Sequence, residues 1–473
     1  MNISIDFTAL TSLGLSNPLF IAWWIFINGG WVVFIALFIV GLYIMKLENA
    51  RMRYRKSIKY ILLAIDVPKE NEQSLKAVEQ IFAQLAAAES KGNLYERYWK
   101  GKVQDTFSME LVSIEGYIQF LIRAPDPHRD LVEAAIYAQY PDAEITEVDD
   151  YTKMIPDIYP DKNFDLFGTE LTLAKESAYP IRTYMNFEHT LTQTFADPMA
   201  SILEALSRLQ TGEQVWFQLV LTPIDSKWVK NATYRVKKLI GEKIPKRTNI
   251  LSPLGDVARG FGDEALNQLA GGGIAASENS QKKDLPSKMQ FLSPGDRNIV
   301  EAIQEKISKI GFKTKIRIIY VARKELFDKK RGVNPIMGGI LQYNTQNLNA
   351  FKAHKKTKTK VNYFRVKKRL AYRQRKIIRA YKRRANYLGI GEGFILNIEE
   401  LASIYHFPIS EITAPLVQKT EIRKAGPPST LPRQAMDYQT LIEKKMDTIK
   451  AEPITPKAGV PENLPIGNEK KDE

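Results

Sequence analysis

The chain has 473 residues, of which 68 are Lys or Arg and 53 are Asp or Glu, so its net charge is +15 at neutral pH. This excess of positive charge favours an anionic partner, such as nucleic acid, acidic lipid or an acidic protein. The absence of cysteine excludes disulfides, thiolate metal sites and cysteine nucleophiles. The four histidines are scattered along the chain and do not suggest a metal site.

An apolar run dominates the N-terminal part of the sequence. No charged residue interrupts it between Asp6 and Lys46, and a helix needs roughly 20 apolar residues to cross a bilayer core. Basic residues follow the run, and Lys and Arg favour the cytoplasmic side. We therefore expect a single-pass membrane anchor at 18–46, an external N-terminus at 1–17 and a cytoplasmic remainder. A cleaved signal peptide is disfavoured because its positive charge would come first. A buried helix of a soluble protein is the alternative.

The region 57–151 alternates between strand and helix patterns. Strands are expected at 57–68, 107–114, 117–124 and 143–148, and helices at 70–90 and 129–140. Glu115-Gly116 separates two apolar runs, which is typical of a hairpin. The resulting β-α-β-β-α-β order predicts a ferredoxin-like domain.

The region 160–398 predicts a second α+β domain. Strands are expected at 165–173, 214–223, 315–322 and 394–398, and helices at 198–209, 228–244, 293–310 and 334–351. The segment 245–289 contains three consecutive glycines and little periodicity, so we expect a mobile insertion. With that insertion set aside, this domain fits a second ferredoxin-like split β-α-β fold.

The most basic part of the sequence is 352–384, with sixteen Lys or Arg residues and no Asp or Glu. Apolar residues recur there at steps of three, four and seven, which predicts a long helix with one apolar seam at 352–388. Aromatic residues lie among the cations, at Tyr363, Phe364, Tyr372 and Tyr381. The predicted nucleic-acid-binding residues are Lys355, Lys356, Lys358, Lys360, Arg365, Lys367, Lys368, Arg369, Arg373, Arg375, Lys376, Arg379, Lys382, Arg383 and Arg384.

Three interpretations of this basic helix stay open. It can bind the phosphates of DNA without reading its sequence, with aromatic rings available to stack on bases. It can lie against acidic headgroups of the membrane to which the chain is tied. It can also dock on an acidic protein. Phosphate binding is the interpretation that we favour.

Nothing in the sequence indicates an enzyme. The phosphate-binding pattern G-x-x-x-x-G-K-[ST] is absent, and the glycines at 389, 391 and 393 fit a linker. No Ser, His and Asp stand in a recognisable catalytic context, and the acidic pairs Asp149-Asp150 and Glu399-Glu400 fit surface or helix-start charge. We therefore predict no catalytic, cofactor-binding or metal-binding residues.

The C-terminal part becomes rich in proline after a short predicted helix at 399–405. From 433 to 473 the composition is polar and proline-rich, which is typical of a disordered tail.

Several blocks of the sequence resemble a known family. The blocks YILLAIDVPKENEQSLKAVEQIFAQL (60–85) and VSIEGYIQFLIRAPDPHRDLVEAAIYAQYPDAEITEVDDY (112–151) resemble the N-terminal, non-ATPase portion of proteins of the type IV secretion and conjugative DNA-transfer family. The blocks NTQNLNAF (344–351), FILNIEELASIYHFP (394–408) and APLVQKTEIRKAGPPSTLP (414–432) resemble the segment just ahead of the motor domain in that family. The resemblance covers roughly residues 18 to 432, and it is strongest to chains from small-genome, uncultivated bacteria.

This resemblance implies a membrane-anchored accessory component of a type IV secretion or DNA-translocation system. The expected partners are a hexameric phosphate-loop ATPase on a separate chain, DNA, the bacterial inner (cytoplasmic) membrane, and further copies of the chain itself. The segment 399–432 is the expected contact with the ATPase. The alternative is a structural membrane scaffold that binds acidic lipid or protein and no nucleic acid.

Overall fold

The computed structural model describes residues 23, 26–27, 31–68, 73–90, 92–187, 197–242, 292–389 and 393–408. The predicted external N-terminus, the insertion at 245–289, the tail at 433–473 and the part of the docking segment beyond 408 lie outside the described residues. Parts of the predicted membrane anchor also lie outside them.

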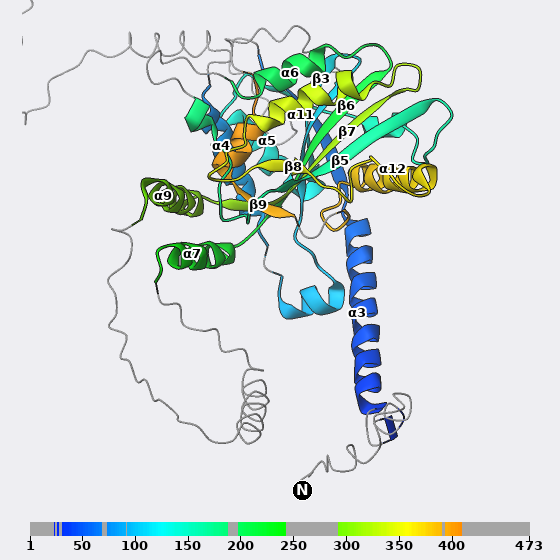
Figure 1. The fold of residues 1–473 in the computed structure, drawn as a ribbon, viewed down its shortest axis with the longest axis vertical. Helices are drawn as coiled ribbons and strands as arrows, with labels where there is room; N and C mark the ends of the chain where they lie inside the picture. Colours follow the sequence, from blue (N-terminus) through cyan, green and yellow to red (C-terminus); the bar gives the residue numbers. More distant parts are fainter. Residues whose placement is uncertain are drawn as a thin grey trace, which may run out of the picture. The chain divides into compact units, whose positions relative to one another are not determined.

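The described residues form an α+β structure around one antiparallel sheet (Figure 1). The nine strands are β1 (Tyr60–Asp66), β2 (Phe107–Ile114), β3 (Tyr117–Pro125), β4 (Glu144–Glu147), β5 (Phe164–Leu173), β6 (Glu213–Pro223), β7 (Gly311–Arg323), β8 (Phe351–Ala353) and β9 (Phe394–Asn397). Their order is β4-β1-β3-β2-β6-β7-β5-β8, and β9 lies off that path and pairs with the first residues of β7. The α+β class predicted from the sequence is confirmed.

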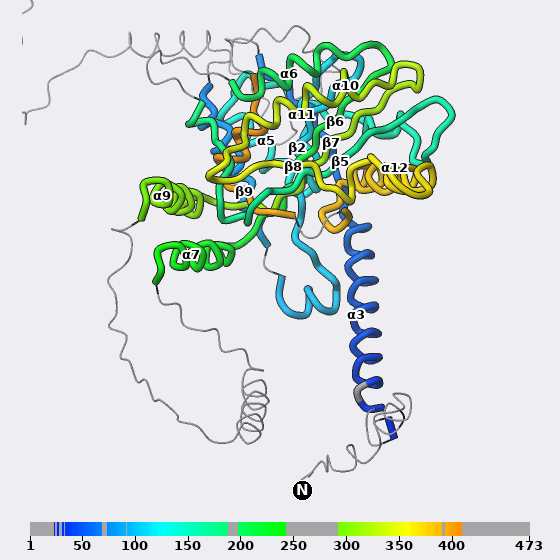
Figure 2. The backbone as a smooth tube through the Cα atoms, viewed as in Figure 1, coloured from blue at the N-terminus to red at the C-terminus, as the bar shows by residue number. Residues whose placement is uncertain are grey.

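The two halves of the sheet repeat one arrangement. In the first half the chain order is β1, helix α4 (Leu75–Leu85), β2, β3, helix α5 (Arg129–Tyr137), β4, and the neighbour order is β4-β1-β3-β2. In the second half β5, β6, β7 and β8 lie in the equivalent order β8-β5-β7-β6. β2 pairs with β6, from Phe107 opposite Leu221 to Ile114 opposite Gln214, so one sheet runs through both predicted domains. Figure 2 follows the backbone through β2, β6, β7 and β5.

The predicted turn between β2 and β3 is present. Glu115 and Gly116 both have positive φ, 55° and 91°, which matches the twist of a two-residue hairpin. Gly116 also lies close to the main chain of the next element, because an added Cβ would come within 2.9 Å of the Ser207 carbonyl oxygen.

One face of the sheet is covered by short amphipathic helices (Figure 1). These are α4 (Leu75–Leu85), α5 (Arg129–Tyr137), α6 (Ala200–Ser207), α11 (Asn334–Leu341) and α13 (Ile398–Ile404), with the short α10 (Lys329–Gly332) before α11. The alternation within each strand sends one set of apolar side chains to this face, so that Phe107, Met109 and Leu111 of β2 join its core.

Three further helices lie apart from that layer. α7 (Lys227–Leu239) and α9 (Pro294–Ser308) pack on each other around Trp228, Val300 and Ile303. α12 (Val366–Lys382) packs on the opposite face of the sheet. Short helical turns occupy Ala86–Ala88, Glu96–Lys100, Asp126–His128, Tyr151–Met154 and Tyr184–Phe187.

α3 (Trp31–Ser57) extends from the body, and its large apolar side chains from Trp31 to Met45 are exposed wherever they are described. A search of the described part of the chain finds no helix that is both long enough and apolar enough to cross a membrane.

The predicted helices at 334–351 and 352–388 are shortened most in the structure, and side-chain hydrogen bonds explain why. The helix expected at 334–351 ends at Leu341, because the Asn344 side chain accepts from the Phe351 N–H and draws the chain into β8. The helix expected at 352–388 begins only at Val366. Before it, the hydroxyls of Thr357 and Thr359 accept from N–H groups of β5 and hold the chain along that strand.

Candidate nucleic-acid interface

α12 is amphipathic, and its apolar side faces the sheet. Ile377, Ile378 and Tyr381 are buried with side chains of the second sheet face, including Trp216. Gly168 of β5 permits this close approach, since an added Cβ would come within 2.9 Å of Ile377 Cγ2. The N-terminal part of the predicted apolar seam does not pack in this way, because Tyr363 is 73% exposed.

A row of buried polar side chains crosses four strands beneath the C-terminal end of α12. Glu110, Gln218, Arg317 and Glu170 lie opposite one another in register on β2, β6, β7 and β5. Gln218 Nε2 donates to Glu110 (2.9 Å), Arg317 Nη1 donates to Gln218 (3.1 Å), and Arg317 Nε donates to Glu170 (2.9 Å). Each polar group in the row therefore has a partner, as burial requires.

Arg384, just after α12, pairs with Glu110 at one end of this row. Its side chain is 2% exposed and donates two hydrogen bonds to Glu110, at 2.9 and 3.1 Å, while also pairing with Asp150. Burial alone would raise the pKa of Glu110, but the Arg384 guanidinium, together with hydrogen bonds from Ser108 and Gln218, holds that pKa below its ordinary value. Tyr151 donates to the same carboxylate, and its hydroxyl contacts that of Tyr381.

The structure thus divides the predicted binding residues into two groups. Arg384 is buried, and Arg373, Lys382 and Lys358 are partly buried. Arg373 donates to the carbonyls of Lys358 and Lys360, and Lys382 pairs with Asp157, so these side chains have structural roles. The remaining side chains are exposed: Lys355, Lys356, Lys360, Arg365, Lys367, Lys368, Arg369, Arg375, Lys376, Arg379 and Arg383.

Several of these cations surround a shallow cavity of about 300 Å³ beside α12. Lys356 contributes from the preceding turn, and Arg369, Arg373 and Lys376 contribute from successive turns of the helix. Tyr372, which is 64% exposed, stands between them. No Asp or Glu lines this cavity, so all of its charged lining residues are cations.

The start of α12 strengthens the positive potential. The helix begins after Phe364 and Arg365, both with positive φ, and no described side chain caps its first N–H groups. Lys367, Lys368 and Arg369 follow in the first turn, where the helix dipole disfavours cations by about 0.3–1 kcal/mol each. A bound anion would relieve both the repulsion and the unpaired N–H groups.

The aromatic residues predicted among the cations have different environments. Tyr363, Phe364 and Tyr372 are exposed, so their rings are accessible for stacking, whereas Tyr381 is fully buried. Arg and aromatic side chains on one surface are the combination that binds single-stranded nucleic acid.

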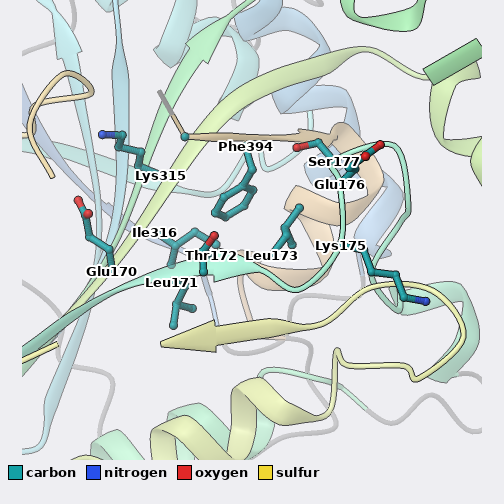
Figure 3. Close-up of a pocket in the computed structure, with 11 residues that line it drawn as sticks. Glu170, Leu171, Thr172, Leu173, Lys175, Glu176, Ser177, Lys315, Ile316 and Phe394 are labelled. Carbon is teal, nitrogen blue, oxygen red and sulfur yellow. The ribbon is translucent and has the colours of Figure 1, made fainter. Parts of the chain in front are cut away.

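A second cavity, of about 240 Å³, lies at the other end of β5 (Figure 3). Its buried Lys315 donates to the Leu388 carbonyl (2.8 Å), and burial lowers the pKa of Lys315 to about 8. The Glu170 carboxylate in the same cavity accepts from Arg317. These ionisable groups therefore hold the fold together. Among the described residues, no cluster of three or more His, Asp or Glu is arranged to hold a metal ion.

Comparison with protein families gives one match. The model of a family described as "Domain of unknown function (DUF8128)" matches residues 59–420, which is more than half of the chain. The chain belongs to the DUF8128 family. No curated protein and no solved structure matches it.

The DUF8128 region contains the whole sheet, α12 and the buried polar row, and its match begins just beyond α3. Sequence reasoning missed the polar row. The sequence feature that could have indicated this row is a charged or amide residue within an apolar strand, as at Glu110 in FSMELVSI and Arg317 in KIRIIYVA. The identity of the partners depends on long-range strand register, which the local pattern does not contain.

Proposed function

We propose that this DUF8128 protein is a membrane-anchored accessory component of a type IV secretion or DNA-translocation system, and that it binds DNA through α12. The observation that carries the proposal is the exposed cationic surface formed by α12 and the turn before it. Its cations are accessible, no carboxylate lines its cavity, and exposed aromatic rings lie among them. Contacts of this kind bind phosphates and stack on bases without specifying a sequence.

The exposed apolar surface of α3 supports the membrane anchor. A helix that is apolar all round needs an apolar surrounding. Trp31 to Met45 alone spans about 21 Å at 1.5 Å per residue, and the apolar sequence continues before Trp31 to Pro18. Lys46 and the arginines after it would then mark the cytoplasmic boundary.

A second apolar element lies at that boundary. Leu94, Tyr95, Tyr98 and Trp99 are all exposed on the segment around the helical turn Glu96–Lys100, which packs on α3. The Lys46 ammonium lies 3.7 Å from the centre of the Trp99 ring. Aromatic rings beside lysine at the end of an apolar helix are typical of the membrane–water interface. We infer that this aromatic segment rests in the headgroup layer.

We also infer that the two halves of the sheet are ferredoxin-like units. The repeated neighbour order β4-β1-β3-β2 and β8-β5-β7-β6 supports this inference. In the second unit, α7, α9 and the residues between them form an insertion between the strands β6 and β7.

The burial of α13 bears on where we propose the contact with a separate hexameric ATPase. Asn397 begins α13 with a capping box, and α13 is buried against the body, so this part of the predicted docking segment belongs to the core. We therefore place the proposed contact in 409–432, outside the described residues.

A pull-down tests this proposal. Tagged full-length protein is purified from detergent-solubilised membranes beside two truncations, one without 409–473 and one without 433–473 only. We expect a phosphate-loop ATPase to co-purify with the full chain and the shorter deletion and to be lost with the longer one. Recovery of lipid or envelope proteins with no ATPase would contradict the secretion proposal.

The alternative is a membrane scaffold whose basic helix meets acidic lipid. One contact favours it: the Arg55 guanidinium, near the end of α3, lies 4.1 Å from the centre of the Tyr387 ring, which follows α12. The C-terminal end of α12 therefore lies close to the proposed anchor. Replacing Arg369, Arg375, Lys376 and Arg379 with Gln separates the two functions. Loss of DNA binding with unchanged binding to acidic liposomes supports DNA, and the reverse supports the scaffold.

A further inference from the structure

A cavity of about 380 Å³ lies where the end of α3 meets the sheet and the segment that follows α12. Arg55 and Lys56 enter it from α3, Arg123 from β3, and Arg383 from the end of α12. Its volume lies within the range of about 300–1,000 Å³ that is usual for small-molecule sites. This cavity shares no lining residue with the cavity of about 300 Å³ beside α12.

The charge inside this cavity is unbalanced. None of its lining residues is Asp or Glu. Arg384 also lines it but is already paired with Glu110 and Asp150. The other four cations form no ion pair with any residue that the structure describes. Cations gathered in this way repel one another, and a bound anion would remove that repulsion.

Arg123 is the most enclosed of the four cations. Its guanidinium lies 3.7 Å from the centre of the Tyr60 ring, which holds the plane of the group in place. Burial, and then the nearby Arg384 charge, lowers the pKa of Arg123 to about 10. The side chain is therefore charged at neutral pH, in a position that disfavours its charge.

Arg55 is held in the same manner over the ring of Tyr387, which also lines the cavity. Stacking fixes the plane of a guanidinium while its N–H edge stays available. Fixed guanidinium edges bind phosphate oxygens with two parallel hydrogen bonds, and this geometry distinguishes phosphate from a simple counter-ion.

We propose that this cavity is a binding site for a phosphate group, held by Arg55, Lys56, Arg123 and Arg383. The phosphate can belong to the headgroup of an anionic phospholipid, an option that rests on the proposed membrane anchor, or to a soluble phosphate ester. Binding would tie the end of α3 to β3 and to the segment after α12, three parts of the chain that are distant in sequence.

A matched pair of double variants tests the site in the full-length chain, purified in a neutral detergent. Arg55→Gln with Arg383→Gln removes two lining cations. Arg53→Gln with Lys324→Gln removes the same charge from exposed positions that lie outside both this cavity and the cationic surface of α12. Calorimetric titration uses two probes, glycerol 1-phosphate and mixed micelles that contain phosphatidylglycerol.

We expect the cavity variant to bind at least one probe at least about tenfold more weakly than the control variant, because two of the four cations that would contact the phosphate are removed. A tenfold loss with glycerol phosphate identifies a soluble phosphate ligand, and one confined to the lipid micelles identifies a headgroup. Equal affinities for the two variants, or no binding of either probe to the wild type, would overturn the proposal. Because glycerol phosphate needs no bilayer, failure of the membrane anchor and failure of the site can be told apart.

Discussion

The adjacent residues Arg383 and Arg384 differ sharply in environment, and replacing each with Gln tests the buried polar row. Arg383 is exposed, whereas Arg384 is buried on Glu110. In Arg384→Gln, the Glu110 carboxylate stays buried without its charge partner. Breaking a buried ion pair from one side costs about 3–5 kcal/mol, whereas an exposed substitution changes stability by about 0.5 kcal/mol or less.

The loss converts into a measurable shift of Tm. The unfolding entropy is about 2.1 cal/mol/K per residue, so the family region 59–420 gives about 0.75 kcal/mol/K and a fall of about 4–7 °C for Arg384→Gln. Thermal unfolding followed by circular dichroism measures this shift, with Arg383→Gln as the control. The double variant Arg384→Gln with Glu110→Gln should recover part of the loss, because it removes the stranded charge. Equal Tm values for the two single variants would refute the reasoning.

Three further predictions follow from the same structure. The pKa values of Glu110 and Asp150 are held below the ordinary 4.5 and 3.8, so the stability that they contribute should be complete above about pH 5 and lost as the pH falls through the lowered values. Urea unfolding from pH 3 to 7 should show the free energy of unfolding falling with pH in this window, and Arg384→Gln should reduce that pH dependence. Gly168→Ala should lower the free energy of unfolding by about 1–3 kcal/mol, because the added Cβ pushes against Ile377. In the control Gly338→Ala, nothing lies within 4 Å of the added Cβ in an exposed part of α11, so the change should be neutral or stabilise by up to about 1 kcal/mol. Similar losses of stability in both variants would contradict the packing of α12 on β5. Because the chain has no cysteine, a fluorophore can be attached at a single introduced cysteine. A fluorophore on Tyr95→Cys should be quenched by nitroxide lipids labelled at the headgroup in nanodiscs, whereas one on Leu341→Cys should not. Equal quenching at both positions would exclude the interfacial placement of the aromatic segment.

Local patterns predicted the elements of this fold well. Short apolar runs located eight of the nine described strands, and Glu115-Gly116 located a hairpin, because strand patterns and turn chemistry act over a few residues. The short strand β8 was missed. The pairing of β2 with β6, which merges the two predicted domains into one sheet, joins residues about a hundred positions apart. No local signal marks such an edge.

The sequence predicted the basic segment of the candidate site. It did not predict which of the cations are exposed and which are buried in the fold. Arg384 and Arg375 look equivalent in the sequence, yet Arg384 is buried and Arg375 is exposed. The difference arises because Glu110 lies on the sheet face beneath Arg384, 274 positions away in the sequence. The basic cavity at the end of α3 was missed for the same reason, since its cations come from three distant segments.

The central claim is that the exposed cations of α12 bind DNA phosphates, and its most direct test is the salt dependence of DNA affinity. Fluorescence anisotropy with a short oligonucleotide is measured between 50 and 200 mM salt for the full chain. A variant with Gln at Arg369, Arg375, Lys376 and Arg379 is compared with one that has Gln at Lys230, Lys238, Lys324 and Lys330, which are exposed elsewhere. We expect the wild type and the control to lose affinity steeply with salt, and the α12 variant to bind weakly with a slope that is smaller by about 0.7–0.9 for each phosphate contact removed. Affinity that is flat with salt, or equal in the two variants, would contradict the claim.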